Sequence, residues 1–149
     1  MDFAQALIKA RFYCAQQERS RFEIKRKLAQ WGLDHGDFEA IIISLEKEDF
    51  LSELRFAEIF AKSKMNQKRW GRMKIREELI KHQLGHTVIE DALTRLDETK
   101  IRSNLAHLAK NKQEELERRS TDYQDEKLKR FLYSKGYEAE LIIDFLKQK

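Results

Sequence analysis

Ile24-Lys25-Arg26-Lys27-Leu28, followed after three further residues by Gly32-Leu33, is the first of three related segments in this 149-residue chain. The second segment starts 51 residues later at Ile75, and the third starts another 53 residues on at Leu128. Each places two apolar residues four apart, then a turn position, then an apolar residue, and each precedes a second amphipathic stretch. A period of about 50 residues indicates a tandem array of helical units, each too small to bury a good core alone.

The composition favours helices throughout the chain. It contains no proline and only five glycines, and 38% of its residues are charged against 41% hydrophobic. Proline and glycine are the residues that interrupt helices, and the sequence has no alternating β-branched runs bounded by turn dipeptides. We therefore expect an all-α protein of three tandem three-helix repeats, at residues 1–51, 52–96 and 97–149.

Local signals mark where individual helices begin and end. Ser20 and Glu23 form a capping-box pattern, Gly32 suits the residue after a helix, and Ser52 suits a cap. Asp34 or Asp37 is expected to cap the third helix. Beyond Ser52, we expect an apolar stripe of Phe56, Ile59 and Phe60 that loses its periodicity around residues 65–70. The other expected helices span 2–18, 20–31, 38–47, 73–83, 88–96, 98–119, 125–134 and 138–147, with a turn at Ser120-Thr121-Asp122.

The cysteine content and the lack of long apolar runs indicate the cellular compartment. The net charge is +4 and the chain holds one cysteine, Cys14, which excludes an internal disulfide and fits a reducing compartment. Cys14 lies on the apolar stripe of the first helix, so we expect it to be inert core. No apolar run is long enough to span a membrane and no secretory signal is evident, so we expect no membrane partner and a cytoplasmic location.

The middle repeat supplies the positive excess. Between Phe60 and Arg76 the chain has seven basic residues and no acid, with one tryptophan among them. We interpret this window as a contact surface for something negative, in preference to a merely solvated helix face. Trp70 is either a stacking contact or a core residue that locks the loop. The contact candidates are Lys62, Lys64, Lys68, Arg69, Trp70, Arg72, Lys74 and Arg76, with a second, partly solvated cluster of Arg19, Arg21 and Lys25.

Other charged and polar residues have structural interpretations. Arg55 is expected to form an ion pair with Glu53 or Glu58 rather than to bind a partner. The basic residues of the third repeat, including Lys127, Lys129 and Arg130, are expected mainly to pair with neighbouring acids. His82 and His86 have the spacing of two zinc ligands, but Gly85 lies between them and no third ligand is evident. We expect no metal, no cofactor and no catalytic activity.

Three motifs in order resemble the RecX family, regulators of the RecA recombinase. They cover the first two repeats, whereas the third repeat matches only in its register and its Lys-Gly-Tyr. Gln83 departs from the family pattern by replacing the glycine of the second repeat, which is expected to loosen a turn. The motifs are Glu18-Arg19-Ser20-Arg21-Phe22-Glu23-Ile24-x3-Leu28-x3-Gly32-Leu33, Phe50-Leu51-Ser52-Glu53-Leu54-Arg55-Phe56-Ala57-x2-Phe60 and Trp70-Gly71-x3-Ile75-Arg76-x-Glu78-Leu79.

The resemblance implies an elongated, curved array of three-helix repeats that binds the RecA–DNA filament and inhibits recombination. The expected partners are the RecA filament and single- or double-stranded DNA, bound without sequence preference by a monomer. One alternative is a helix-turn-helix DNA-binding protein without a RecA partner, although the second helices start with residues that make a poor reading head. A second alternative is a scaffold with no nucleic-acid contact.

Overall fold

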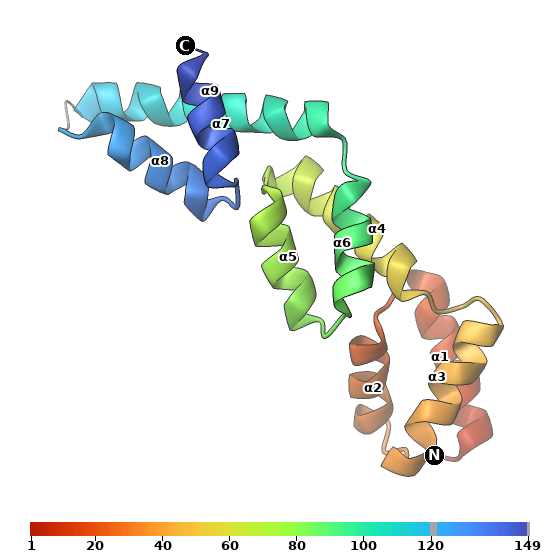
Figure 1. Ribbon diagram of the computed structural model, residues 1–149. Coiled ribbons are helices and arrows are strands. Elements are labelled where there is room, and N and C mark those ends of the chain that lie inside the picture. Colours follow the sequence, from red (N-terminus) through yellow and green to blue (C-terminus); the bar gives the residue numbers. More distant parts are fainter. Residues whose placement is uncertain (120–121, 149) are drawn as a thin grey trace. The chain divides into compact units, whose positions relative to one another are not determined.

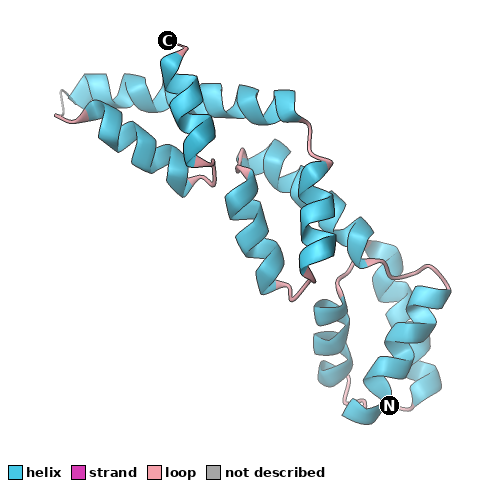
Figure 2. Ribbon diagram, in the orientation of Figure 1, coloured by secondary structure: helices cyan, strands magenta, loops and turns pink. Residues whose placement is uncertain are grey.

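The computed structural model describes residues 1–119 and 122–148, and over these residues the chain forms helices and turns without a strand. Figures 1 and 2 show the helices and the short loops that join them. The prediction of an all-α protein is confirmed. The helices are α1 (Phe3–Gln16), α2 (Arg21–Gln30), η1 (His35–Asp37), α3 (Phe38–Lys47), α4 (Glu53–Lys68), α5 (Arg72–Lys81), α6 (His86–Thr94), α7 (Glu98–Arg119), α8 (Gln124–Ser134) and α9 (Ala139–Lys147).

Side-chain caps start several of these helices. Ser20 and Glu23 form the predicted capping box of α2, and Asp2 with Gln5 forms another at α1. The Ser52 hydroxyl accepts a hydrogen bond from the Arg55 N–H at 3.2 Å, which confirms Ser52 as a cap. Asp37 occupies the predicted N-cap position of α3, but neither Asp37 nor Asp34 makes a side-chain cap hydrogen bond, and a 3-10 turn leads into the helix. Of the turn predicted at 120–122, residues 120 and 121 lie outside the described residues.

The repeated turn position has the same backbone conformation each time. Gly32 and Gly136 have φ angles of +79° and +97°, and Gln83 adopts +61° in the second copy. The Leu33 N–H donates to the Leu28 carbonyl at 3.1 Å. The Tyr137 N–H makes the corresponding bond to Leu132 at 3.3 Å. Each turn therefore ends its helix with a left-handed residue and returns the following apolar residue to the interior.

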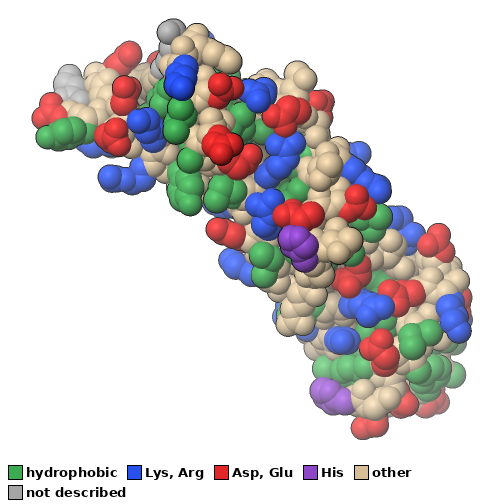
Figure 3. Space-filling view, in the orientation of Figure 1, with side chains coloured by type: hydrophobic (Ala, Val, Ile, Leu, Met, Phe, Trp, Pro, Cys, Tyr) green, Lys and Arg blue, Asp and Glu red, His purple; other side chains and the backbone are tan. Residues whose placement is uncertain are grey.

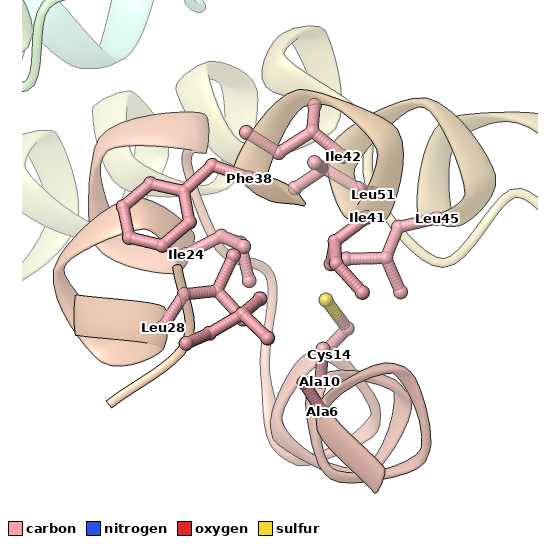
Figure 4. Close-up of a cluster of buried hydrophobic side chains, with 11 residues drawn as sticks. Ala6, Ala10, Cys14, Ile24, Leu28, Phe38, Ile41, Ile42, Leu45 and Leu51 are labelled. Atoms are coloured by element: carbon pink, nitrogen blue, oxygen red, sulfur yellow. The ribbon is translucent and has the colours of Figure 1, made fainter. Parts of the chain in front are cut away.

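The N-terminal core fills the space between α1, α2 and α3 (Figure 4). Ala6 and Ala10 let α1 approach closely, while α2 and α3 contribute larger aliphatic side chains such as Leu28 and Ile41. Cys14 is buried among them, and burial raises the pKa of its thiol to about 11. A thiol in this state stays protonated at neutral pH, which agrees with the expectation of inert core.

Compactness divides the described chain into two units that do not follow the sequence repeat. One unit comprises Met1–Ile59 and Leu79–Asp91, and the other comprises Phe60–Glu78 and Ala92–Lys149. The repeat boundaries at 51/52 and 96/97 stay a prediction. In the second unit α8 packs along the long helix α7, and Leu105, Leu128 and Leu132 are buried.

The stripe predicted for α4 needs one correction. Ile59 is 56% exposed, whereas the buried positions of the helix are Phe56, Ala57, Ala61 and Met65. Ala57, Ala61 and Met65 follow one another at intervals of four residues, so they lie on one face of the helix, and this face is buried. Ile59 lies on a different face and is exposed. The helix extends to Lys68, and so includes residues 65–68, where the apolar periodicity of the sequence is lost.

Candidate nucleic-acid interface

Trp70 lies at the centre of the basic window and is half-buried. Two ammonium groups lie over its ring, Lys64 Nζ at 5.3 Å and Lys74 Nζ at 4.8 Å from the centroid. Among the described residues, no carboxylate pairs with either lysine. The ring thus holds two positive charges near one point without neutralising them. We call Trp70 with Lys64 and Lys74 the Trp70 cluster.

The turn that carries Trp70 is held by the α8–α9 turn. Gly71 donates its N–H to the Lys135 carbonyl at 2.8 Å, and Met73 donates to the Gly136 carbonyl at 2.9 Å. A Cβ at Gly71 would lie 2.5 Å from the Gly136 carbonyl oxygen, so only glycine permits this approach. We call this contact the Gly71–Gly136 junction.

Two buried side chains complete the support of this turn. The Tyr137 hydroxyl donates to the Arg69 carbonyl at 2.6 Å, and Asn104, 2% exposed, donates its amide to the Met65 carbonyl at 2.9 Å. Both bonds satisfy backbone carbonyls at or just beyond the end of α4, where no intrahelical donor remains. Arg69 itself has a φ of +55° as the chain leaves the helix. The Trp70 cluster therefore stands on a fixed turn.

The contact candidates of the basic window separate into two kinds. Lys62 and Lys68 are exposed on α4, and no described residue forms an ion pair with either. Arg72 instead binds inside the protein, donating to the Leu93 carbonyl at 3.3 Å and to Glu98 at 2.8 Å. The hydrogen bond from Arg72 lowers the pKa of the Glu98 carboxyl. Arg69 and Arg76 are half-buried.

In the second predicted cluster, Arg19 and Arg21 bind other groups of the same chain. The Arg19 guanidinium lies 3.7 Å from the Tyr13 ring centroid and donates to the Tyr13 carbonyl at 3.1 Å. Arg21 forms an ion pair with Glu46 at 2.7 Å and approaches Glu53 at 3.8 Å. Only Lys25 of the three is exposed.

Arg55 makes an ion pair as predicted, but with other partners. It binds Glu18 at 3.0 Å and Asp49 at 2.7 Å instead of Glu53 or Glu58. Glu53 faces Arg21, and burial raises the pKa of its carboxyl. Glu18 lies in the loop between α1 and α2, and sequence spacing alone does not bring it near Arg55.

The arrangement of cations over aromatic rings was not predicted from the sequence. Besides Trp70, two further half-buried rings each hold two cations: Tyr13 with Arg19 and Lys27, and Phe131 with Lys112 and Lys135. One such ring occurs in each predicted repeat. An aromatic residue near basic residues was visible in the sequence, but the pairing of Phe131 with Lys112 depends on the packing of α7 against α8.

The described residues include no group of three or more His, Cys, Asp or Glu side chains able to hold a metal ion. The His82 ring packs against Phe56 with their centroids 5.1 Å apart, which gives it a structural contact. No helix in the part of the chain that the structure describes is both long and apolar enough to cross a membrane. On the face drawn in Figure 3, basic and acidic side chains are interspersed over most of the surface.

These features define a class: an all-helical protein of small three-helix units, with cations gathered over aromatic rings at its surface. The chain belongs to the RecX family. Residues 52–93 match the family model described as RecX, second three-helix domain. Regulatory protein RecX of Clostridium botulinum (strain Alaska E43 / Type E3) is 33% identical over 128 residues, which cover 85% of this chain and 59% of that protein. Regulatory protein RecX of Herminiimonas arsenicoxydans is 36% identical over 96 residues, 62% of this chain and 58% of that protein.

Solved structures share the fold. The crystal structure of RecX from Lactobacillus salivarius has a TM-score of 0.86 at 24% identity and covers 97% of this chain and 94% of that one. A crystal structure of regulatory protein RecX has a TM-score of 0.88 at 20% identity, covering 98% and 71% respectively. The chain spans about three fifths of the length of the curated relatives, 59% for the Clostridium botulinum protein.

Proposed function

We propose that this chain regulates the RecA recombinase by binding the RecA–DNA filament, as a monomer in the cytoplasm, and so inhibits recombination and DNA repair. Its relatives carry the name regulatory protein, and the described residues offer no candidate metal centre. Inhibition is steric in this proposal: the helical units lie against the filament and block strand access or promote disassembly.

The single observation that supports a negatively charged target is the Trp70 cluster. Lys64 and Lys74 are held over one ring, and no carboxylate among the described residues pairs with them. Two like charges kept close together repel each other, and an anionic partner relieves that repulsion. A phosphate backbone supplies such a partner in repeated form.

The proposed contact set is smaller than the basic window. Lys62, Lys64, Lys68, Lys74 and Trp70 form it, with Arg69 at the turn between the two helices. Arg72 already satisfies the Leu93 carbonyl and Glu98, so its loss would act on folding before binding. Arg19 and Arg21 are left out for the same reason, since Arg19 binds the Tyr13 carbonyl and Arg21 binds Glu46.

The proposal is tested by reversing two charges that the fold does not use. We expect Lys62→Glu/Lys68→Glu to raise the concentration needed for half-inhibition of RecA strand exchange by roughly tenfold, because both lysines are exposed and no described residue pairs with either. Thermal stability should stay nearly constant, since surface substitutions of this kind change the free energy of unfolding by about 0.5 kcal/mol or less.

The matched control is Lys47→Glu/Lys110→Glu, which reverses two other exposed lysines that pair with no residue in the described ranges. The assay is run at about 50 mM and about 200 mM salt, and the wild-type inhibition should weaken at the higher concentration. Equal inhibition by the wild type and both variants at both salt concentrations would contradict this contact surface.

The helix-turn-helix alternative is disfavoured, for the first two repeats, by the first turns of α2 and α5. A reading head needs unoccupied side chains at the start of a recognition helix. Arg21 opens α2 and Arg72 opens α5, and both arginines bind carboxylates of the same chain. Undiminished binding to random-sequence competitor DNA would agree with non-specific contact and exclude a sequence reader.

A further inference from the structure

The third repeat contains a basic groove between α7 and α8. Its volume is about 450 Å³, and none of the described residues that line it is acidic. The lining combines four cations with Leu116, Phe131 and Ser134; the cations are Lys112, Arg119, Lys127 and Arg130. We call this feature the α7–α8 groove.

The charges of the groove are only partly neutralised. Glu115 pairs with Lys112 at 3.3 Å and with Arg119 at 3.6 Å. Lys127 and Arg130 form no ion pair with any described residue, whereas Lys129, on the same helix, pairs with Glu126 at 3.6 Å. The expectation that the third-repeat cations mainly pair with local acids is therefore correct for Lys129 and wrong for Lys127 and Arg130.

Two lysine ammonium groups lie over the ring of Phe131, one of the residues that line the groove. The ammonium groups of Lys112 and Lys135 lie 5.0 Å and 5.5 Å from its ring centroid. No described residue forms an ion pair with Lys135, and Glu115, which pairs with Lys112, also pairs with Arg119. The groove thus keeps an excess of positive charge that the protein does not compensate.

The Gly71–Gly136 junction connects the groove to the Trp70 cluster. Lys135, whose ammonium lies over Phe131, accepts the Gly71 hydrogen bond through its carbonyl, next to Trp70 in the chain. Two clusters of uncompensated cations thus flank one backbone contact within the same compact unit. A ligand that carries regularly spaced anions satisfies both, as a nucleic-acid backbone does.

An acidic protein segment is the rival occupant of the α7–α8 groove. Such segments usually anchor through large apolar side chains placed in pockets. Here Leu116 is buried and Phe131 already lies beneath two ammonium groups. The cations Lys127 and Arg130, with which no described residue forms an ion pair, offer hydrogen-bond donors and positive charge, which suit phosphate oxygens.

We propose that the α7–α8 groove binds the sugar–phosphate backbone of a nucleic acid and extends the contact made by the Trp70 cluster. The inference rests on the proposed function only for the identity of the biological target. Binding at the groove itself requires no recombinase, so it is measured with the protein alone.

The test compares two double variants of the full chain. Lys127→Gln/Arg130→Gln removes the unpaired groove cations, and Lys129→Gln/Lys147→Gln removes two positive charges outside the groove lining. Binding of a fluorescein-labelled oligothymidylate is followed by fluorescence anisotropy across a salt series. We expect the groove variant to bind about tenfold more weakly, with a reduction of up to roughly two in the salt slope, and the control variant to bind nearly as the wild type does.

The outcomes separate the two proposals. Equal oligonucleotide binding by the groove and control variants, with both folded by circular dichroism, overturns the groove as a nucleic-acid site. Loss of filament inhibition with unchanged oligonucleotide binding overturns it too, and assigns the groove to a protein face. If the groove variant loses oligonucleotide binding while the wild type does not inhibit RecA, the groove stands and the proposed function fails.

Discussion

Gln83 occupies a backbone conformation that glycine adopts more readily. Its φ of +61° matches the turn positions of Gly32 and Gly136 in the other two copies of the repeat. A side chain in the left-handed region costs roughly 1–2 kcal/mol, which the surrounding packing must offset. The sequence motif led us to expect a looser turn, whereas the backbone keeps the same conformation and accepts strain at one residue.

This strain predicts opposite effects at equivalent positions. We expect Gln83→Gly to raise the free energy of unfolding by about 0.5–1 kcal/mol, because glycine adopts the left-handed conformation without a steric penalty. Part of this gain is lost because glycine makes the unfolded chain more flexible. Gly32→Gln should lower it by about 1 kcal/mol, since nothing lies within 4 Å of a Cβ there and only the φ of +79° opposes the side chain. Urea titration measures both, and a destabilised Gln83→Gly variant would show that the Gln83 side chain makes a compensating contact.

At the scale of elements, two short turns that lie far apart in the sequence are bound to each other. The α4–α5 turn and the α8–α9 turn meet at the Gly71–Gly136 junction through two backbone hydrogen bonds. Tyr137 lies beside this contact, is fully buried, and has its phenol pKa raised by burial. The repeat could not reveal the junction, because Gly71 lies outside the repeated segment and Gly136 is only the turn position of its third copy.

The junction predicts a large difference between two glycine-to-serine substitutions. Gly71→Ser should lower the free energy of unfolding by about 2–4 kcal/mol, because its Cβ would overlap the Gly136 carbonyl at 2.5 Å. Gly85→Ser is the matched control: nothing lies within 4 Å of a Cβ at Gly85, and serine suits a helix start. Thermal and urea denaturation of the pair measure the difference. Similar stability of the two variants would mean that the two turns can separate without cost.

At the scale of the whole molecule, stability comes from two compact units, each with a buried aliphatic interior. Leu28 lies in the N-terminal unit and Leu132 in the other, and both are fully buried. The repeat predicts them as equivalent positions, and their burial confirms that register. Ile80, one residue beyond the equivalent leucine of the middle copy, is 57% exposed.

These positions predict how the chain responds to lost core volume. Leu28→Ala and Leu132→Ala should each cost about 2–5 kcal/mol of unfolding free energy, whereas Ile80→Ala should cost less than about 1 kcal/mol. Differential scanning calorimetry of the three variants gives both the cost and the unit affected. A negligible cost at both leucines would contradict the burial of the repeated apolar positions.

The amino-acid sequence by itself determined the helices, their caps at Ser20 and Ser52, the repeated turn and the buried leucines, because these features follow from periodicity and from residues within a few positions of one another. Only the tertiary structure decided which cations are available. Arg72 binds Glu98, Arg21 binds Glu46 and Arg55 binds Glu18, each 25 or more residues away in the chain. Lys127 and Arg130 form no ion pair with a described residue, although acids surround them in sequence. Ion pairing depends on distances between separate helices, and those distances are set by packing rather than by spacing along the chain.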